Sequence, residues 1–192
     1  MKFTFSEAEE QFRQELREWI KTELDSKPTD TGVNSEASWQ FNLDIRKKLA
    51  DKGWLTMAWP EEYGGQAATH MRQVVFNEEM AYRGIPSGDS GIQMVGPILM
   101  LYGTEEQKNY FIPGIINGDI NFCQGFTEPS GGADLASLQC RAVLDGDDFI
   151  VNGQKIYTSG AHAATHVYLM VRTDPEAPKH RGISILLVPM DT

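Results

Sequence analysis

The sequence predicts an α+β protein in which helices come first and strands follow. Up to about residue 119, apolar residues recur at helical spacing and glycines end the runs. From Ile120 onward the apolar runs are short and bounded by turns such as Asp145-Gly146-Asp147. We therefore expect an all-helical domain over residues 1–119 and an antiparallel β-barrel or β-sandwich domain over residues 120–192.

The helical part carries two clear start signals. Ser6 with Glu9, and Thr104 with Gln107, have the spacing of capping boxes, in which each side chain bonds the other residue's backbone N–H. Behind Ser6 the apolar residues fall on one helical face, as core-facing residues do. Helices are expected at both caps and over residues 36–52, 68–83 and 87–102. A polar loop is expected over residues 25–35, and W-P-E-E-Y-G-G at residues 59–65 is interpreted as a rigid helix–helix connection.

The predicted fourth helix, residues 87–102, is unusual because small residues crowd its start. Such residues let a ligand or another helix approach closely, and Pro97 should kink the axis. Met94 and Val95 could line a tunnel for an apolar ligand, or could equally pack in the core. The apolar stretch after Gln107 is expected to be broken by Pro113.

The composition limits the class of protein. The 192 residues carry a formal net charge of −10, and 41% are hydrophobic, enough for a real core. The acidity argues against nucleic acid or an anionic membrane as a partner. No apolar run reaches the roughly 18 residues of a membrane span, and residues 1–10 lack the pattern of a signal peptide. Cys123 and Cys140 are expected to be reduced, so we expect a soluble, cytoplasmic protein.

The second part of the chain is expected to contain six strands and two motifs that suggest chemistry. The strands are expected at residues 121–127, 138–144, 149–151, 155–158, 167–172 and 183–189. Within T-E-P-S-G-G-A-D, residues 127–134, the stretch from Ser130 to Ala133 has almost no side chains, so its backbone can approach an anionic ligand closely. Thr127, Tyr157 and Ser159 could face a flat heteroaromatic ring, with one ring to stack and two hydroxyls to bond its edge. The alternative is a glycine-rich turn that binds nothing.

Four ordered blocks resemble the acyl-CoA dehydrogenases. These blocks are W-P-E-E-Y-G-G at 59–65, Y-G-T-E-E-Q-K at 102–108, F-T-E-P-S-G-G-A-D at 126–134 and N-G-Q-K-I-Y-T-S-G-A at 152–161. The family patterns are T-E-P-x-x-G-S-D and N-G-x-K-x-[WF]-[IT]-[TS]. The chain departs from them at Ala133, where many members have serine, and at Tyr157, where tryptophan is commoner. The first change loses a hydroxyl contact, and the second keeps stacking with less area.

The resemblance implies an FAD-binding protein. In the family, a helical domain packs on a β-barrel domain and a C-terminal helical bundle completes the fold, so this chain is expected to lack the bundle and the end of the barrel. The positions expected to contact FAD are Gln124, Phe126, Thr127, Gly132, Ala133, Tyr157 and Ser159. Phe126 and Thr127 would lie at the pyrimidine edge, Gly132 and Ala133 near the pyrophosphate, Tyr157 on a flavin face and Ser159 near N5. The positions expected to contact substrate are Met94, Val95 and Ala133.

The family reaction is the α,β-dehydrogenation of an acyl-CoA thioester to the trans-2-enoyl-CoA. A carboxylate removes the α-proton, hydride passes to flavin N5, and the electrons leave through an electron-transfer flavoprotein. The family's base lies beyond Thr192, so no catalytic residue and no metal ligand are assigned in this chain. The family is usually tetrameric, which implies a homo- or hetero-oligomer. The alternatives are a non-catalytic partner subunit of a heteromeric acyl-CoA dehydrogenase and a related flavin oxidase or monooxygenase.

Overall fold

The computed structural model describes residues 4–24 and 35–192. The chain forms two compact units, the helical unit (residues 1–119) and the β unit (residues 120–192). The loop expected at residues 25–35 lies outside the described residues, apart from Ser35, whose side chain caps the helix that follows it. No described helix is both long enough and apolar enough to cross a membrane.

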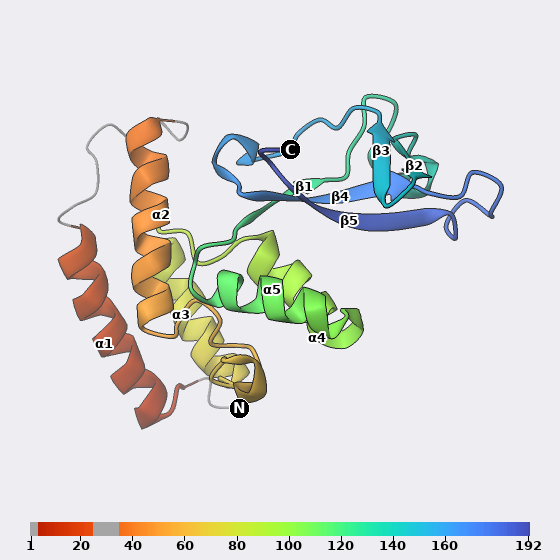
Figure 1. Ribbon diagram of the computed structural model, residues 1–192. Coiled ribbons are helices and arrows are strands. Elements are labelled where there is room, and N and C mark those ends of the chain that lie inside the picture. Colours follow the sequence, from red (N-terminus) through yellow and green to blue (C-terminus); the bar gives the residue numbers. More distant parts are fainter. Residues whose placement is uncertain (1–3, 25–34) are drawn as a thin grey trace. The chain divides into compact units, whose positions relative to one another are not determined.

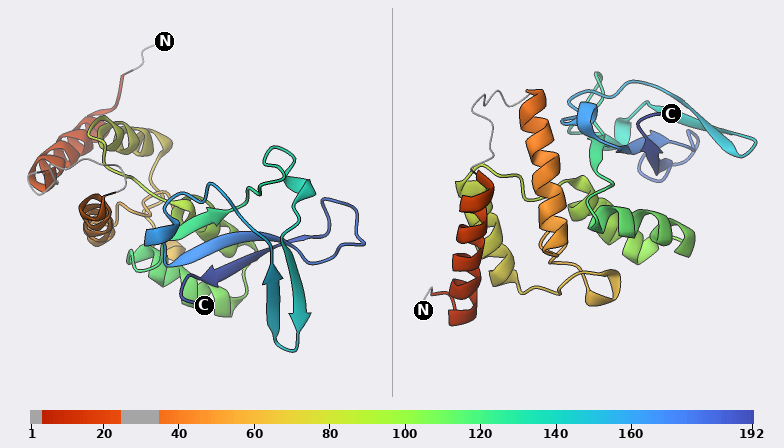
Figure 2. Two further views of the ribbon diagram at one scale, coloured as in Figure 1. Left: turned by 90° about the horizontal axis from the view of Figure 1, so that it is seen from above. Right: turned by 60° about the vertical axis from the view of Figure 1, so that its left-hand side comes forward.

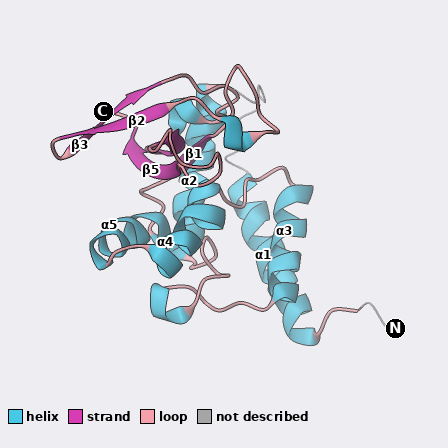
Figure 3. Ribbon diagram, turned by 90° about the vertical axis from the view of Figure 1, so that its right-hand side faces the viewer, coloured by secondary structure: helices cyan, strands magenta, loops and turns pink. Residues whose placement is uncertain are grey.

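Five α-helices form the helical unit (Figure 1). Their bounds are α1 Glu7–Leu24, α2 Glu36–Asp51, α3 His70–Tyr82, α4 Gly96–Tyr102 and α5 Glu105–Ile116. Both predicted capping boxes are present, since Ser6 and Glu9 exchange side-chain bonds with each other's backbone N–H groups, as do Thr104 and Gln107. α1 and α3 lie side by side (Figure 3). The unit's core includes Leu16, Ile45, Val75 and Ile115, each no more than 1% exposed.

Two expectations about prolines need correction. The predicted fourth helix is not one kinked α-helix: residues Gly91–Val95 form a π-helical turn, and α4 begins at Gly96. The second expectation was a break at Pro113, but α5 runs through it. A proline inside a helix removes one backbone bond, and here Ile112 and Ile115, both buried, anchor the turns on either side of that defect.

The β unit is built on one five-stranded sheet. Its strands are β1 Phe122–Gly125, β2 Arg141–Asp145, β3 Asp148–Asn152, β4 His166–Arg172 and β5 Ile183–Pro189. The expectation of a purely antiparallel sheet is wrong, because β4 runs parallel to β1 and to β2, while the β2–β3 and β4–β5 pairs are antiparallel. Phe122 of β1 is paired with His166 of β4. The chain forms the β2–β3 hairpin between these two strands before β4 returns beside β1. This long connection is what permits a parallel pair.

The hairpin β2–β3 projects from the rest of the sheet (Figure 2, left). Apart from Ala142, its apolar residues are exposed, among them Leu144 (62%) and Phe149 (45%), which face each other across the hairpin. At its base, Cys140, Ala142 and Val171 form a buried cluster against Leu169 and Leu186. The predicted strand at 155–158 does not form, and these residues follow an irregular path with no ladder partner.

Candidate functional site

The loop that follows β1 folds back on itself in a tight turn. The N–H groups of Glu128 and Gly131 each donate to the other's carbonyl at 3.1 Å, with Pro129 at the corner. Proline presets the φ angle that this corner needs. Gly132 then passes close to Thr127, because a methyl group added at Gly132 would lie 3.3 Å from Thr127 Cγ2. The same addition at Gly131 would meet no atom within 4 Å, so the loop presents an open backbone there.

A second segment, residues 155–159, is bonded to this loop. The N–H of Ile156 donates to the carbonyl of Thr127 at 2.9 Å. Thr127 therefore lies beside the segment that carries Tyr157 and Ser159, although 30 positions separate Thr127 from Tyr157. The structure thus brings together the two motif blocks that the sequence placed far apart.

Tyr157 has a backbone conformation that non-glycine residues rarely adopt. Its φ is +57°, and its side chain is 85% exposed. A residue held in this region costs on the order of 1–3 kcal/mol and persists only where its surroundings enforce it. Just beyond it, the N–H of Ser159 donates to the Tyr157 carbonyl at 3.0 Å. The result is an aromatic ring that stands out from the β unit rather than packing into it.

The other nominated residues of the β unit lie around this loop. Gln124 is exposed on β1, in register with Tyr168 of β4. The ring of Phe126 packs against that of Tyr168, with centroids 5.1 Å apart. Ala133 is exposed at the end of the small-residue stretch. Thus Thr127, Gly132, Tyr157 and Ser159 share one neighbourhood, with Phe126 at its start.

Glu128 is a residue of this site that the sequence analysis did not select. Its carboxylate accepts hydrogen bonds from the backbone N–H groups of Gln139 at 2.6 Å and Cys140 at 2.8 Å. Burial alone would raise the pKa of Glu128, but the bonds from Lys155, Gln139 and Cys140 outweigh it and hold the pKa below its ordinary value. The available signal was a pair of opposite charges, with Glu128 in the first motif and Lys155 as the one charged residue of the second.

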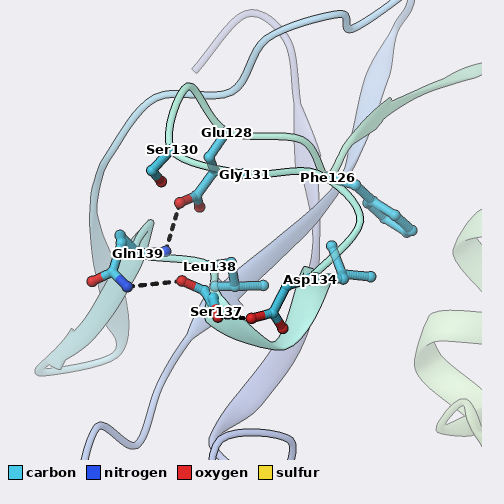
Figure 4. A pocket seen from close by; sticks show the side chains of 9 residues that line it. Phe126, Glu128, Ser130, Gly131, Asp134, Ser137, Leu138 and Gln139 are labelled. Carbon is cyan, nitrogen blue, oxygen red and sulfur yellow. Dashed lines mark hydrogen bonds between the residues drawn. The ribbon is translucent and has the colours of Figure 1, made fainter.

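A pocket of about 440 Å³ opens beside the same loop (Figure 4). The residues lining it include Phe126, Glu128, Ser130, Gly131, Asp134, Ser137 and Gln139. Asp134 accepts a bond from the Ser137 hydroxyl and another from Lys179 at 3.2 Å, and these two bonds lower the pKa of Asp134. Among the described residues that the sequence predicted to contact FAD or substrate, Phe126 alone lines this pocket. The pocket is therefore separate from the Thr127–Tyr157 neighbourhood.

Met94 and Val95 lie in the π-helical turn of the helical unit. Val95 is 1% exposed, whereas Met94 is half-buried. Trp59 fixes this turn, because its indole Nε1 donates to the Ile92 carbonyl at 3.0 Å. A substrate-contacting role for Met94 and Val95 stays a prediction, with Met94 the more accessible of the two.

Comparisons with known proteins bear on these motifs. Two family models match in order: the acyl-CoA dehydrogenase N-terminal domain over residues 6–119 and the middle domain over residues 123–192. The acyl-CoA dehydrogenase FadE26 of Mycobacterium tuberculosis is 42% identical over 195 residues, covering 98% of this chain and 49% of that protein. The chain belongs to the acyl-CoA dehydrogenase family. It spans about half the length of the curated relatives it matches.

Solved structures agree with this assignment. The structure named Tcur3481-Tcur3483 steroid ACAD has a TM-score of 0.89 at 44% identity, covering 100% of this chain and 50% of that one. A chain of the ChsE4-ChsE5 complex from Mycobacterium tuberculosis has a TM-score of 0.86 at 42% identity, covering 98% and 48%. A glutaryl-CoA dehydrogenase from Mycobacterium smegmatis, solved in complex with FADH2, has a TM-score of 0.70 at 26% identity, covering 98% and 47%.

The residues of the loop fit FAD, the cofactor that the family implies. At Gly131 a side chain would meet no atom within 4 Å, so a pyrophosphate can approach the backbone closely there. The exposed ring of Tyr157 offers a stacking surface, and Thr127 and Ser159 each supply a hydroxyl that can donate or accept a bond. No described residue has to move out of the way of Gly131 for a ligand to reach it.

Proposed function

We propose that this chain is the N-terminal part of an FAD-dependent acyl-CoA dehydrogenase that oxidises an acyl-CoA thioester to the trans-2-enoyl-CoA. One observation supports this most: the bond from Ile156 N–H to the Thr127 carbonyl, which joins the two flavin motifs of the family beside an exposed Tyr157. The match to both family domains in order supports the same proposal.

Each nominated residue has a stated role in this proposal. The backbone of Phe126 and the hydroxyl of Thr127 bind the pyrimidine edge of the flavin, and Tyr157 covers one of its faces. Gly132 and Ala133 lie against the pyrophosphate, and Ala133 lacks the hydroxyl that many relatives place there. Ser159 bonds near N5, and Gln124 lies against cofactor or substrate. FAD, when bound, supplies the two-electron oxidation by accepting hydride from the β-carbon of the acyl group.

The chain's residues orient the reactants, and the base comes from outside the chain. We assign removal of the α-proton to a carboxylate that a further polypeptide segment supplies. Met94, Val95 and Ala133 contact the acyl-CoA, and an electron-transfer flavoprotein takes the electrons. The 44% identity to a structure named as a steroid ACAD favours a bulky acyl group.

A second candidate is a partner subunit of a heteromeric acyl-CoA dehydrogenase that does not itself catalyse the reaction. The observation in its favour is that a similar chain was solved in a complex of two different proteins, ChsE4 and ChsE5. In that case the chain would supply part of the flavin site to a complementary subunit. Both candidates place FAD against Thr127 and Tyr157, and they differ in which polypeptide carries the base.

The test uses FAD and a panel of acyl-CoAs with the 192-residue chain, alone and together with the polypeptide that completes it. The chain alone is expected to bind FAD weakly and to turn nothing over, because it lacks the base. The completed assembly is expected to hold FAD and to lose its visible flavin absorption when a substrate acyl-CoA is added without an acceptor. Steady turnover by the chain alone would contradict the division of roles, and an assembly that ignores FAD would contradict the function.

A further inference from the structure

Lys155 is the third partner of the buried Glu128 carboxylate, after the backbone N–H groups of Gln139 and Cys140. Its Nζ lies 2.8 Å from Glu128 Oε1, and the two side chains are only 9% and 5% exposed. Since Glu128 also holds the amides of Gln139 and Cys140, one carboxylate joins three segments: the loop after β1, the residues before β2, and the residues before Tyr157.

The ammonium group of Lys155 makes one more bond in the same place. It donates to the Phe126 carbonyl at 3.2 Å, next to the bond between Ile156 and Thr127. Two consecutive residues, 155 and 156, are therefore bonded to three consecutive residues, 126 to 128. This arrangement fixes the direction in which the chain reaches Tyr157.

The strained backbone of Tyr157 needs such a constraint from its neighbours. Its ring is almost fully exposed, so packing of the ring cannot hold φ at +57°. The constraints lie on either side: Lys155 and Ile156 before it, and the N–H of Ser159 bonded to its carbonyl after it. Without the first set, the constraint before Tyr157 is lost, and the bond from Ser159 is left to oppose relaxation of Tyr157 to an ordinary negative φ.

A buried ion pair adds little net stability to a protein. Taking both charges out of water offsets most of their attraction, and apolar residues of similar volume stabilise a protein as well or better. A pair of fixed geometry does, however, specify one arrangement of the chain.

We propose that Glu128 and Lys155 are positioning residues that hold Tyr157 and the Ser159 hydroxyl in the arrangement that receives the flavin. This inference rests on the proposed function. It predicts that breaking the ion pair weakens FAD binding by more than the accompanying loss of stability explains. Only a fraction of the folded molecules would then present the competent arrangement, and the affinity falls in proportion to that fraction.

The test compares Glu128→Gln and Lys155→Met with wild type in the complete flavin-binding protein that contains this chain. Each variant removes one charge; glutamine keeps the length of glutamate, and methionine is one atom shorter than lysine. We expect FAD binding to weaken about tenfold or more. Hydrogen exchange should accelerate at the amides of Ile156 and Ser159 while protection of the helices stays unchanged. Lys155→Arg, which keeps the charge and can still donate bonds, should recover part of the affinity.

Glu79→Gln is the matched control. Glu79 is a carboxylate with a side chain 6% exposed, bonded to Arg13 and Arg17, so its loss weakens the fold at similar burial, but in the helical unit and not in the β unit that carries Tyr157. If folded Glu128→Gln and Lys155→Met proteins bind FAD as tightly as wild type, or lose affinity only as much as Glu79→Gln does, the inference is overturned and the proposed function stands. If wild type itself binds no FAD, both are overturned.

Discussion

Glu79 of α3 ties two helices together through a single carboxylate. Arg13 and Arg17 of α1 reach it at 2.9 and 2.8 Å. The bond from Arg17, followed by that from Arg13, outweighs burial and holds the pKa of Glu79 below its ordinary value of 4.5. A carboxylate with a lowered pKa adds stability that is complete above the unfolded pKa and is lost as the pH falls through the folded one.

Glu79→Gln should therefore lower the free energy of unfolding of the helical unit at neutral pH by roughly 1–3 kcal/mol, the range for bonds to charged groups. The difference in the free energy of unfolding between wild type and variant should become smaller as the pH is lowered below 4.5. Only the wild type has this carboxylate, and protonating it removes its advantage. Urea unfolding followed by far-UV circular dichroism measures both values. Glu78→Gln is the control, since that half-exposed neighbour also meets Arg13 but should contribute under about 1 kcal/mol. A gap that stays constant with pH would contradict the account.

For single residues, the sequence could predict which residues belong to the candidate site but not the conformations that they adopt. Thr127, Tyr157 and Ser159 were selected from their chemistry and Gly132 from the resemblance; the bond from Ile156 to Thr127 brings the two segments together, and the contacts of these residues with a flavin stay a prediction. The positive φ of Tyr157 could not be predicted, because it results from bonds between residues distant in sequence rather than from the preference of tyrosine. Glu128 and Lys155 were not selected for the same reason, since their side chains become buried, to 5% and 9% exposed, only when the segments meet.

Among the elements, the π-helical turn at Gly91–Val95 has a definite physical cause. The N–H of Gly96 bonds to Gly91, five residues back, so the Ile92 carbonyl would depend on the N–H of residue 97. Residue 97 is proline and has none, and the indole of Trp59 takes its place at 3.0 Å. Gly96 allows that approach, because a Cβ there would lie 2.1 Å from the Trp59 ring.

Gly96→Ala and Trp59→Phe should each destabilise the helical unit, for different reasons. The added methyl clashes with the indole, an overpacking effect of about 1–3 kcal/mol. Phenylalanine leaves the buried Ile92 carbonyl without its donor, a cost of about 1–3 kcal/mol. The double variant should cost less than the sum, since phenylalanine lacks the outer ring atoms that the methyl meets. Thermal unfolding of the four proteins measures the coupling, and strict additivity would disprove this contact.

Elements with local signals were predictable, and those that depend on distant contacts were not. α1 and α5 begin at the capping boxes that Ser6 and Thr104 indicated, because capping depends on four consecutive residues. The break expected at Pro113 was wrong, since packing of buried Ile112 and Ile115 overrides the local penalty of proline. The strand expected at 155–158 has β-forming residues but is bonded to a loop instead of a ladder. Parallel pairing of β4 also had no local signal.

For the molecule as a whole, the β2–β3 hairpin is the most exposed apolar feature of the β unit. Val143 and Ile150 face each other on one side of it, and Leu144 and Phe149 on the other. All four are at least 45% exposed. Among the described strands, β3 pairs with β2 alone, so its outer edge also has unpaired backbone groups. Such an edge promotes association.

Leu144→Lys should therefore reduce self-association of the 192-residue chain while changing its free energy of unfolding by less than about 0.5 kcal/mol, as for other surface substitutions. Sedimentation velocity and thermal unfolding measure the two effects. Leu101→Lys is the control, because Leu101 of α4 is 73% exposed but lies outside the hairpin. Equal effects of the two substitutions would show that general hydrophobicity, and not the hairpin, drives association.

The parallel pairing of β1 with β4 also dictates an order of events during synthesis. Phe122 leaves the ribosome well before its partner His166, and the hairpin forms from adjacent residues in the interval. Closing this long loop is slow compared with forming a hairpin. β1 therefore stays unpaired with β4 while residues 126–172 are synthesised, so translation speed through these residues sets how long the strand lacks its partner.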